Sequence, residues 1–146
     1  DDFYLPGNMP RIIQEFCART GQEVPQTKGE IVRCVYESLA FKYRWTIERL
    51  EEILNKPLGV LHIVGGGSKN ELLNQFTANA INRPVICGPT EATAVGNLMI
   101  QAMALEEVKD LAEIRQIVKE SFPTVDYMPK DVEQWNDAYQ RFLKVL

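Results

Sequence analysis

The chain has 146 residues, of which 45% are hydrophobic, so it is long and apolar enough to bury the core of one globular domain. Its formal net charge of -4 and the lack of a basic cluster argue against nucleic acid as a partner. No stretch approaches the roughly 20 apolar residues that cross a bilayer, so we predict a cytoplasmic protein without membrane contact. The N-terminus, Asp1-Asp2-Phe3-Tyr4, has neither Met nor a signal segment, and we therefore expect a piece of a longer chain.

Two helices are predicted in the first third of the chain. Asn8 can cap the first, Pro10 suits its first position, and Gly21 ends it. Thr27 and Glu30 have the spacing of a capping box, and apolar residues recur every three or four positions after them. This pattern predicts a second helix of about 27 residues that stops before a proline. We expect the charged side chains of this helix at the surface, among them Arg33, Glu37, Lys42 and Arg44.

The three cysteines, Cys17, Cys34 and Cys87, have no C-x-x-C spacing, and the sequence offers one histidine, His62. A metal site is therefore not expected. We predict buried thiols, although Cys17 and Cys34 lie on neighbouring predicted helices and could form a disulfide. His62 lies in the middle of a predicted strand, where a packed core residue is expected.

The middle of the chain has the pattern strand, loop, helix, strand. Val60 to Val64 predicts a buried strand, which runs into three consecutive glycines. Glu71 to Ile81 predicts an amphipathic helix, and Pro84 to Cys87 predicts a short second strand. Two strands make a thin sheet, which needs partner strands from outside this sequence.

Three further helices are predicted in the last third of the chain. Thr90 can cap a helix of small and apolar residues, which we expect to be buried against a neighbouring element. Asp110 can cap another helix that ends near Ser121, and a last helix follows Pro129. The packing face of that last helix is predicted to consist of Trp135, Tyr139 and Phe142. The fold class is therefore α/β, rich in helices and with a small sheet.

The triple glycine Gly65-Gly66-Gly67 is the strongest candidate for a binding site. Glycines let a ligand approach the backbone, and the helix that follows offers unpaired N–H groups and a positive dipole end, which suit phosphate. The dinucleotide fingerprint fails because Asn70 stands at its third glycine position, and the Lys of a P-loop is missing. The plain alternative is a tight turn in which Ser68 caps the helix and Glu71 completes a capping box. Asn70 carries a donor and an acceptor, which suit the edge of an adenine base.

Segments spread over nearly the whole chain carry a resemblance to a known family. They are Phe3 with Pro6-Gly7-Asn8-Met9-Pro10, Gly29-Glu30-Ile31 with Arg33-Cys34, Glu37-Ser38-Leu39-Ala40, His62-Ile63-Val64-Gly65-Gly66-Gly67-Ser68 with Asn70, and Gly88-Pro89 with Glu91-Ala92-Thr93-Ala94. In these segments the chain resembles the C-terminal part of the FGGY family of carbohydrate kinases. The segment from Gly88 to Asn97 favours the rhamnulokinase branch of that family.

This resemblance implies the actin-like ATPase architecture, in which two ribonuclease H-like domains hold ATP in a cleft. Residues 1–146 would form the C-terminal part of the second domain, on the ATP-binding side. The N-terminal domain, the sugar-binding residues and the catalytic aspartate would belong to sequence outside this chain. By the same resemblance, Gly66 and Gly67 lie against the ATP or ADP, and Ser68 and Asn70 face its adenosine end. Mg²⁺ would be held mainly through the phosphates and by residues of the missing part.

The implied reaction transfers phosphate from ATP to L-rhamnulose and gives L-rhamnulose 1-phosphate. With no catalytic residue in this chain, we expect the fragment alone to be inactive. A kinase for another ketose, such as fuculose or xylulose, is an alternative because the sugar is bound mainly by the missing part. A non-catalytic nucleotide-binding or interaction module with the same loop is the alternative from another functional class.

Overall fold

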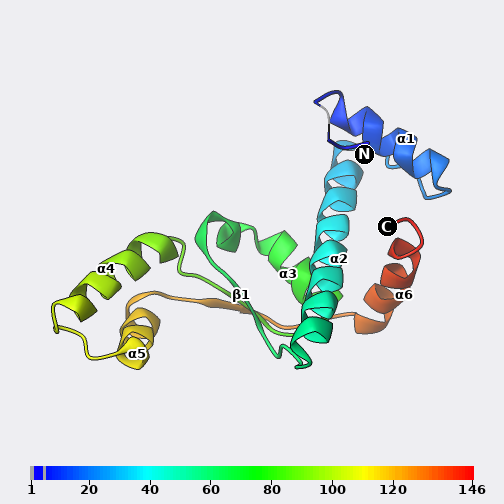
Figure 1. The fold of residues 1–146 in the computed structure, drawn as a ribbon. Coiled ribbons are helices and arrows are strands. Elements are labelled where there is room, and N and C mark those ends of the chain that lie inside the picture. Colours follow the sequence, from blue (N-terminus) through cyan, green and yellow to red (C-terminus); the bar gives the residue numbers. More distant parts are fainter. Residues whose placement is uncertain (1, 5) are drawn as a thin grey trace.

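The computed structural model describes residues 2–4 and 6–146 (Figure 1). Their elements follow in the order α1 (Met9–Arg19), α2 (Lys28–Leu54), β1 (Leu61–Ile63), the 3₁₀ helix η1 (Gly65–Lys69), α3 (Glu71–Ile81), β2 (Val85–Cys87), α4 (Ala92–Ala104), α5 (Leu111–Ser121), β3 (Val125–Tyr127) and α6 (Val132–Phe142). Asp1, the first residue of the N-terminal stretch, lies outside the described residues. None of the described helices is long and apolar enough to cross a membrane.

Capping side chains explain why most predicted helix boundaries are confirmed. Asn8 accepts a hydrogen bond from a backbone amide in the first turn of α1. Thr27 and Glu30 make both bonds of the capping box before α2, which has 27 residues. Asp110 accepts bonds from two amides at the start of α5. Each of these caps pairs amides that the helix itself leaves without a partner, so a local pattern is enough to locate the helix start.

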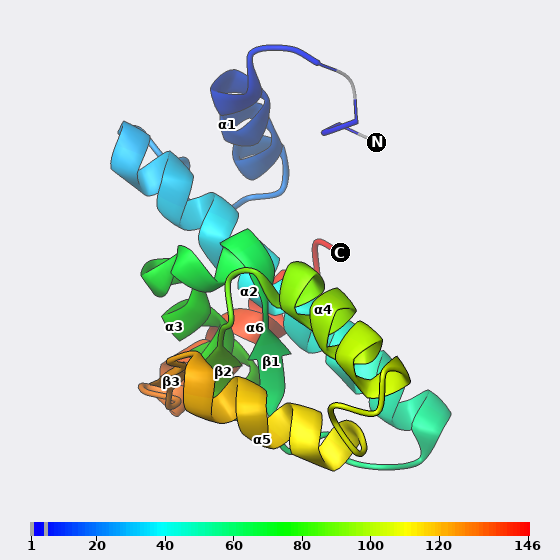
Figure 2. The ribbon, with the colours of Figure 1, turned by 90° about the vertical axis from the view of Figure 1, so that its left-hand side faces the viewer.

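The described residues form a three-stranded sheet with β2 in the centre. β1 pairs with β2 in parallel, and β3 pairs with β2 antiparallel. The sequence analysis missed β3, because its three residues lie between two prolines and are too few to show an alternating pattern. Helices α2 and α3 lie behind the sheet in Figure 2 and bury one side of it. The core at this contact consists of Ile47, Ala78, Ile81, Val85 and Cys87.

The sheet has one buried face, which corrects two predictions about β1. Successive side chains of a strand point to opposite faces. Leu61 and Ile63 pack against the core, whereas His62 points to the other face and is exposed. The strand is therefore buried on one side only, and the prediction that His62 is a packed core residue is wrong.

Helix α6 packs against α2 through an aromatic cluster, as predicted. The ring of Phe41 lies 5.4 Å from that of Trp135 and 5.5 Å from that of Phe142. Tyr139, in the middle of the cluster, is 1% exposed. Close offset and tilted rings of this kind add stabilisation beyond the apolar area that they bury.

Arg44 lies beside this cluster and differs from the other charged residues of α2 for which a cleft or surface position was considered, Arg33, Glu37 and Lys42. Its Nη1 donates to the carbonyl oxygen of Ala80 at 3.1 Å and to Oδ1 of Asn136 at 2.7 Å. Its Nε pairs with Glu48 at 3.0 Å, and its side chain is 19% exposed. Because these partners lie on α2, α3 and α6, Arg44 joins three helices, and the prediction of a surface position is wrong for this residue.

The predictions for α4 are wrong on two points. The residue before the helix is Glu91 rather than Thr90, and no side chain caps the helix start. No residue of α4 is buried, and α4 and α5 lie away from α1, α2 and α6 (Figure 1). The apolar side chains Leu98 and Leu105 are 66% and 75% exposed. Within the described residues, the small side chains of α4 therefore do not pack closely against a neighbour.

Candidate functional site

The glycine loop, η1 (Gly65–Lys69), connects the end of β1 to the start of α3. Gly65 has a φ of +74°, a conformation that side chains with a Cβ rarely adopt, so the turn itself requires glycine at this position. The next residues wind into a 3₁₀ helix, and a short connection at Asn70 leads into α3. The predicted sequence of strand, glycine turn and helix is confirmed, with one extra turn of helix between them.

The segment after β2, Gly88 to Thr90, contacts the glycine loop and the end of β1. The amide of Gly65 donates to the carbonyl oxygen of Pro89 at 3.2 Å, and the amide of Gly88 donates to that of Ile63 at 2.8 Å. The hydroxyl of Thr90, which does not cap α4, lies 3.4 Å from that of Ser68. These contacts give the glycine loop a fixed base, and they account for one of its three glycine amides.

The turn conformation and the bond to Pro89 explain why residue 65 is a glycine, but they do not explain the glycines at Gly66 and Gly67. A Cβ atom added at Gly66 would meet no atom within 4 Å, and one added at Gly67 would come within ordinary contact distance, 3.6 Å, of Ile63. Among the described residues, neither amide donates to a carbonyl or side chain of another segment. Within the 3₁₀ helix, the amide of Gly67 donates to the carbonyl oxygen of Val64, the residue before the helix. Among the described residues, the amide of Gly66 is therefore the one without a partner, and it lies beside open space, which fits the close approach of an anionic ligand such as a phosphate or nucleotide.

Asn70, rather than Ser68, caps α3. Oδ1 of Asn70 accepts a hydrogen bond from the amide of Leu73 at 3.2 Å, and its Nδ2 donates to the hydroxyl of Tyr36 at 3.0 Å. The hydroxyl of Ser68 instead donates to the carbonyl oxygen of Gly65 at 2.7 Å. The alternative in which Ser68 and Glu71 form a capping box is therefore wrong, and Asn70 has two of its bonding positions already filled.

Two residues that hold the glycine loop were not singled out from the sequence. Nδ2 of Asn74 donates to the carbonyl oxygen of Ser68 at 3.0 Å, and Asn74 is 1% exposed. Tyr36 reaches the loop from α2, 34 positions earlier in the chain. A signal for Asn74 existed, since it lies four residues after Asn70 on the same helix face. No local pattern could have linked Tyr36 to the loop.

A cavity of 280 Å³ lies beside the glycine loop. Its walls come from the loop, the start of α3 and the segment between β2 and α4, and its lining includes Ser68, Lys69, Glu71, Gly88, Thr90 and Tyr127. Of the four predicted nucleotide-binding residues, Gly66 supplies a free amide and Ser68 lines this cavity. The structure thus brings the glycine loop and the Gly88 to Thr90 segment together, where they follow the ends of the neighbouring strands β1 and β2.

The described residues contain no group of three or more His, Cys, Asp or Glu side chains that could hold a metal ion.

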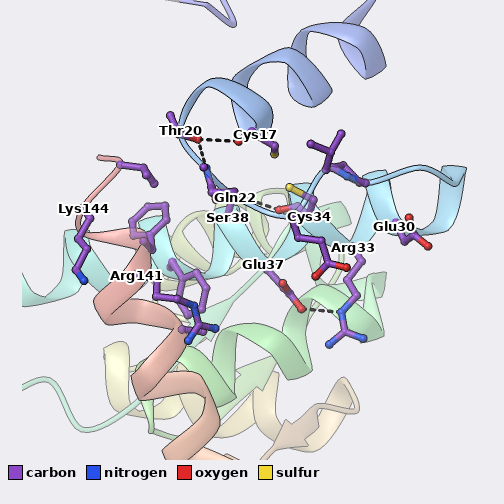
Figure 3. A pocket seen from close by; sticks show the side chains of 18 residues that line it. Cys17, Thr20, Gln22, Glu30, Arg33, Cys34, Glu37, Ser38, Arg141 and Lys144 are labelled. Atoms are coloured by element: carbon purple, nitrogen blue, oxygen red, sulfur yellow. Dashed lines mark hydrogen bonds and ion pairs between the residues drawn. The ribbon is translucent and has the colours of Figure 1, made fainter.

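A larger cavity of 710 Å³ lies between α1, α2 and the C-terminal residues (Figure 3). None of the predicted nucleotide-binding residues lines it. Cys17 and Cys34 point toward each other across one of its walls, and both thiols are free, so the structure contains no disulfide between them. Burial and the neighbouring Cys17 thiol raise the pKa of Cys34 to about 11. The ion pair of Arg33 and Glu37, 2.7 Å long, lies at the outer edge of the cavity.

Comparison with known proteins identifies the family. A family model described as the C-terminal domain of the FGGY family of carbohydrate kinases matches residues 1–105. The chain belongs to this family. The FGGY match ends within the first residues after α4, so α5, β3 and α6 lie beyond it.

Curated relatives of this FGGY chain include rhamnulokinases. It is 51% identical over 142 residues to the rhamnulokinase of Bacteroides thetaiotaomicron, an alignment that covers 97% of this chain and 29% of the relative. It is 46% identical over 132 residues to the rhamnulokinase of Bacillus subtilis, which covers 90% of this chain and 27% of the relative. The chain therefore spans less than a third of the length of these relatives.

Solved sugar kinases share the fold. A crystal structure of Plasmodium falciparum glycerol kinase with ADP matches with a TM-score of 0.70 at 21% identity, over 85% of this chain and 25% of that one. A crystal structure of xylulose kinase from Rhodospirillum rubrum matches with a TM-score of 0.66 at 22% identity, over 86% of this chain and 25% of that one. The fold is thus that of part of an actin-like ATPase domain, with many helices and a small sheet.

Proposed function

We propose that this FGGY chain is the ATP-binding, C-terminal part of the second domain of a kinase that converts L-rhamnulose to L-rhamnulose 1-phosphate. The observation that carries the nucleotide site is the amide of Gly66, which has no partner among the described residues and lies beside open space. The choice of sugar rests on the identity of 51% to the rhamnulokinase of Bacteroides thetaiotaomicron, whereas the xylulose kinase of Rhodospirillum rubrum is 22% identical. The N-terminal domain, which this chain does not include, would supply the sugar site and the catalytic aspartate. We expect the complete kinase to be cytoplasmic.

In this proposal the chain positions the nucleotide and does not take part in bond making. Gly66 and Gly67 lie against the nucleotide on one side of the cleft, the amide of Gly66 donates to it, and Ser68 and Asn70 lie at its adenosine end. An aspartate outside this chain would deprotonate the sugar hydroxyl that attacks the γ-phosphorus of ATP. Phosphoryl transfer depends mostly on positioning and charge stabilisation, so a domain that only holds the nucleotide still contributes to the rate. Mg²⁺ would bind the phosphates and neutralise charge there.

Titration of the purified chain with ADP, followed by calorimetry, tests the nucleotide site. We expect weak binding by the natural chain, because about half of the contacts to the nucleotide would come from the missing part. Gly66→Ala should lower the affinity about tenfold or more, since its methyl group occupies space that the ligand needs. The same methyl group meets no protein atom, so folding should be unaffected.

Gly59→Ala is the matched control, because a Cβ atom there also meets nothing within 4 Å and Gly59 precedes β1, at the opposite end of that strand from the glycine loop. It should leave ADP binding unchanged. No binding of ADP by the natural chain, or equal binding by the Gly66→Ala variant, would contradict the proposed site. Turnover of L-rhamnulose by the 146-residue chain alone would contradict the proposal that the catalytic residues lie outside this chain.

A further inference from the structure

Tyr36 contacts the proposed nucleotide site from 34 positions earlier in the chain. Its hydroxyl accepts a hydrogen bond from Nδ2 of Asn70 at 3.0 Å, and both side chains are half-buried. Tyr36 belongs to α2, the long helix that packs along α3. The contact therefore ties a side chain at the start of α3 to a different, rigid helix.

The two hydrogen bonds of Asn70 fix which way its amide group faces. The amide of Leu73 can only donate, so the atom of Asn70 that faces it, 3.2 Å away, must be the oxygen. The nitrogen then faces Tyr36, whose hydroxyl can accept. One N–H of Nδ2 and one lone pair of Oδ1 remain unpaired, and their directions are set by the two bonds already made.

We propose that Tyr36 is a positioning residue of the nucleotide site, which holds the amide of Asn70 so that its free N–H and oxygen lone pair meet the edge of an adenine base. This inference rests on the proposed function, in which Asn70 faces the adenosine end of ATP. A side chain that is already held in its binding orientation loses less conformational freedom when the ligand arrives, so the bond to Tyr36 favours binding without touching the nucleotide.

Tyr36→Phe tests the proposal, because it removes the hydroxyl and keeps the ring. Calorimetric titration of the purified chain with ADP should give a dissociation constant about three to ten times higher than that of the natural chain, which corresponds to one lost hydrogen bond. The preference for ADP over GDP should fall as well, since an Asn70 amide that is held only by its bond to Leu73 is less firmly oriented toward the base edge. A purely structural role of Tyr36 would leave that preference unchanged.

Tyr43→Phe is the matched control: Tyr43 lies on the same helix, is 38% exposed and makes no side-chain hydrogen bond among the described residues. It should bind ADP as the natural chain does. A double-mutant cycle with Asn70→Ala completes the test, because a residue that acts through Asn70 should have no further effect once Asn70 is gone.

The outcomes separate this inference from the proposed function. If the natural chain binds ADP and Tyr36→Phe binds it equally well and with the same preference over GDP, the role of Tyr36 is overturned and the nucleotide site stands. If Tyr36→Phe weakens binding equally in the presence and absence of Asn70, Tyr36 acts by another route and the proposal is also overturned. If the natural chain binds no ADP, the proposed function falls, and this inference falls with it.

Discussion

The thiol of Cys34 shows how one buried contact changes the chemistry of a residue. Burial and the nearby Cys17 thiol raise its pKa to about 11. The thiolate is the form that reacts with alkylating agents, so Cys34 should react slowly with iodoacetamide at pH 8 and progressively faster as the pH approaches 11. Mass spectrometry of peptides from samples quenched at several times measures this rate for each cysteine.

The same shift predicts how stability depends on pH. Because the folded-state pKa is higher than the ordinary value of about 9, the contribution is fully present below pH 9 and is lost as the pH rises toward 11. The urea concentration at the midpoint of unfolding should therefore fall between pH 9 and pH 11. Cys34→Ser should reduce this fall. An equally steep fall in that variant would contradict the assignment to Cys34 and indicate the other groups whose pKa is raised, chiefly by burial, namely Cys87, Tyr127 and Tyr139.

Among contacts between elements, the bonds of Arg44 connect the most distant segments. Arg44→Ala removes the bonds to Ala80 on α3, Asn136 on α6 and Glu48, and it takes the side-chain donor away from the carbonyl oxygen of Ala80, a fully buried residue. We expect the free energy of unfolding to drop by about 2 to 4 kcal/mol, because hydrogen bonds to charged groups are worth more than neutral ones and unpaired buried groups add a penalty. Urea unfolding followed by circular dichroism measures the change.

Arg49→Ala is the control for this prediction. Arg49 also belongs to α2 and forms an ion pair of 2.6 Å with Glu52, but both side chains are about half exposed. Exposed pairs contribute little, so its free energy of unfolding should change by less than about 1 kcal/mol. Equal effects of the two variants would show that the contacts of Arg44 with α3 and α6 do not stabilise the fold.

How well each element could be predicted follows from the range of the interactions that define it. The boundaries of α2, α3 and α5 are set by caps and apolar spacing within a few residues, and the sequence analysis predicted them correctly. The strand β3, the exposure of His62 and the lack of burial in α4 depend on which distant segments lie against them. No pattern within one segment carries that information.

The candidate site divides in the same way. The glycine loop and the position of Asn70 were read from adjacent residues, and the structure places them together at the start of α3. The turn alternative named Ser68 as the cap of the helix, whereas the cap is Asn70, because a turn of 3₁₀ helix separates Ser68 from the start of α3. Tyr36 could not be found, since its contact with Asn70 spans 34 positions of the chain.

The helices of the molecule differ in how many buried residues they contribute to the core. α2, α3 and α6 share the buried clusters, whereas α4 contributes no buried residue and exposes Leu98 and Leu105. Exposed apolar side chains on a helix usually mark a contact surface. Because the chain spans 29% of the length of its 51% identical relative, we expect other segments of the complete kinase to cover α4.

Hydrogen exchange tests this difference in the isolated chain. Regions with few buried contacts open with little cost in free energy, so the amides of α4 should exchange at least about tenfold faster than those of α3, which contains Ala78 and Ala80, both fully buried. Mass spectrometry after exchange in heavy water at neutral pH provides the comparison, and light scattering after gel filtration establishes whether the sample is monomeric. Equal protection of the two helices in a monomer would contradict the exposed position of α4. Equal protection in a dimer would indicate instead that a second copy covers its apolar face, and dilution to the monomer should then restore fast exchange in α4 while α3 stays protected.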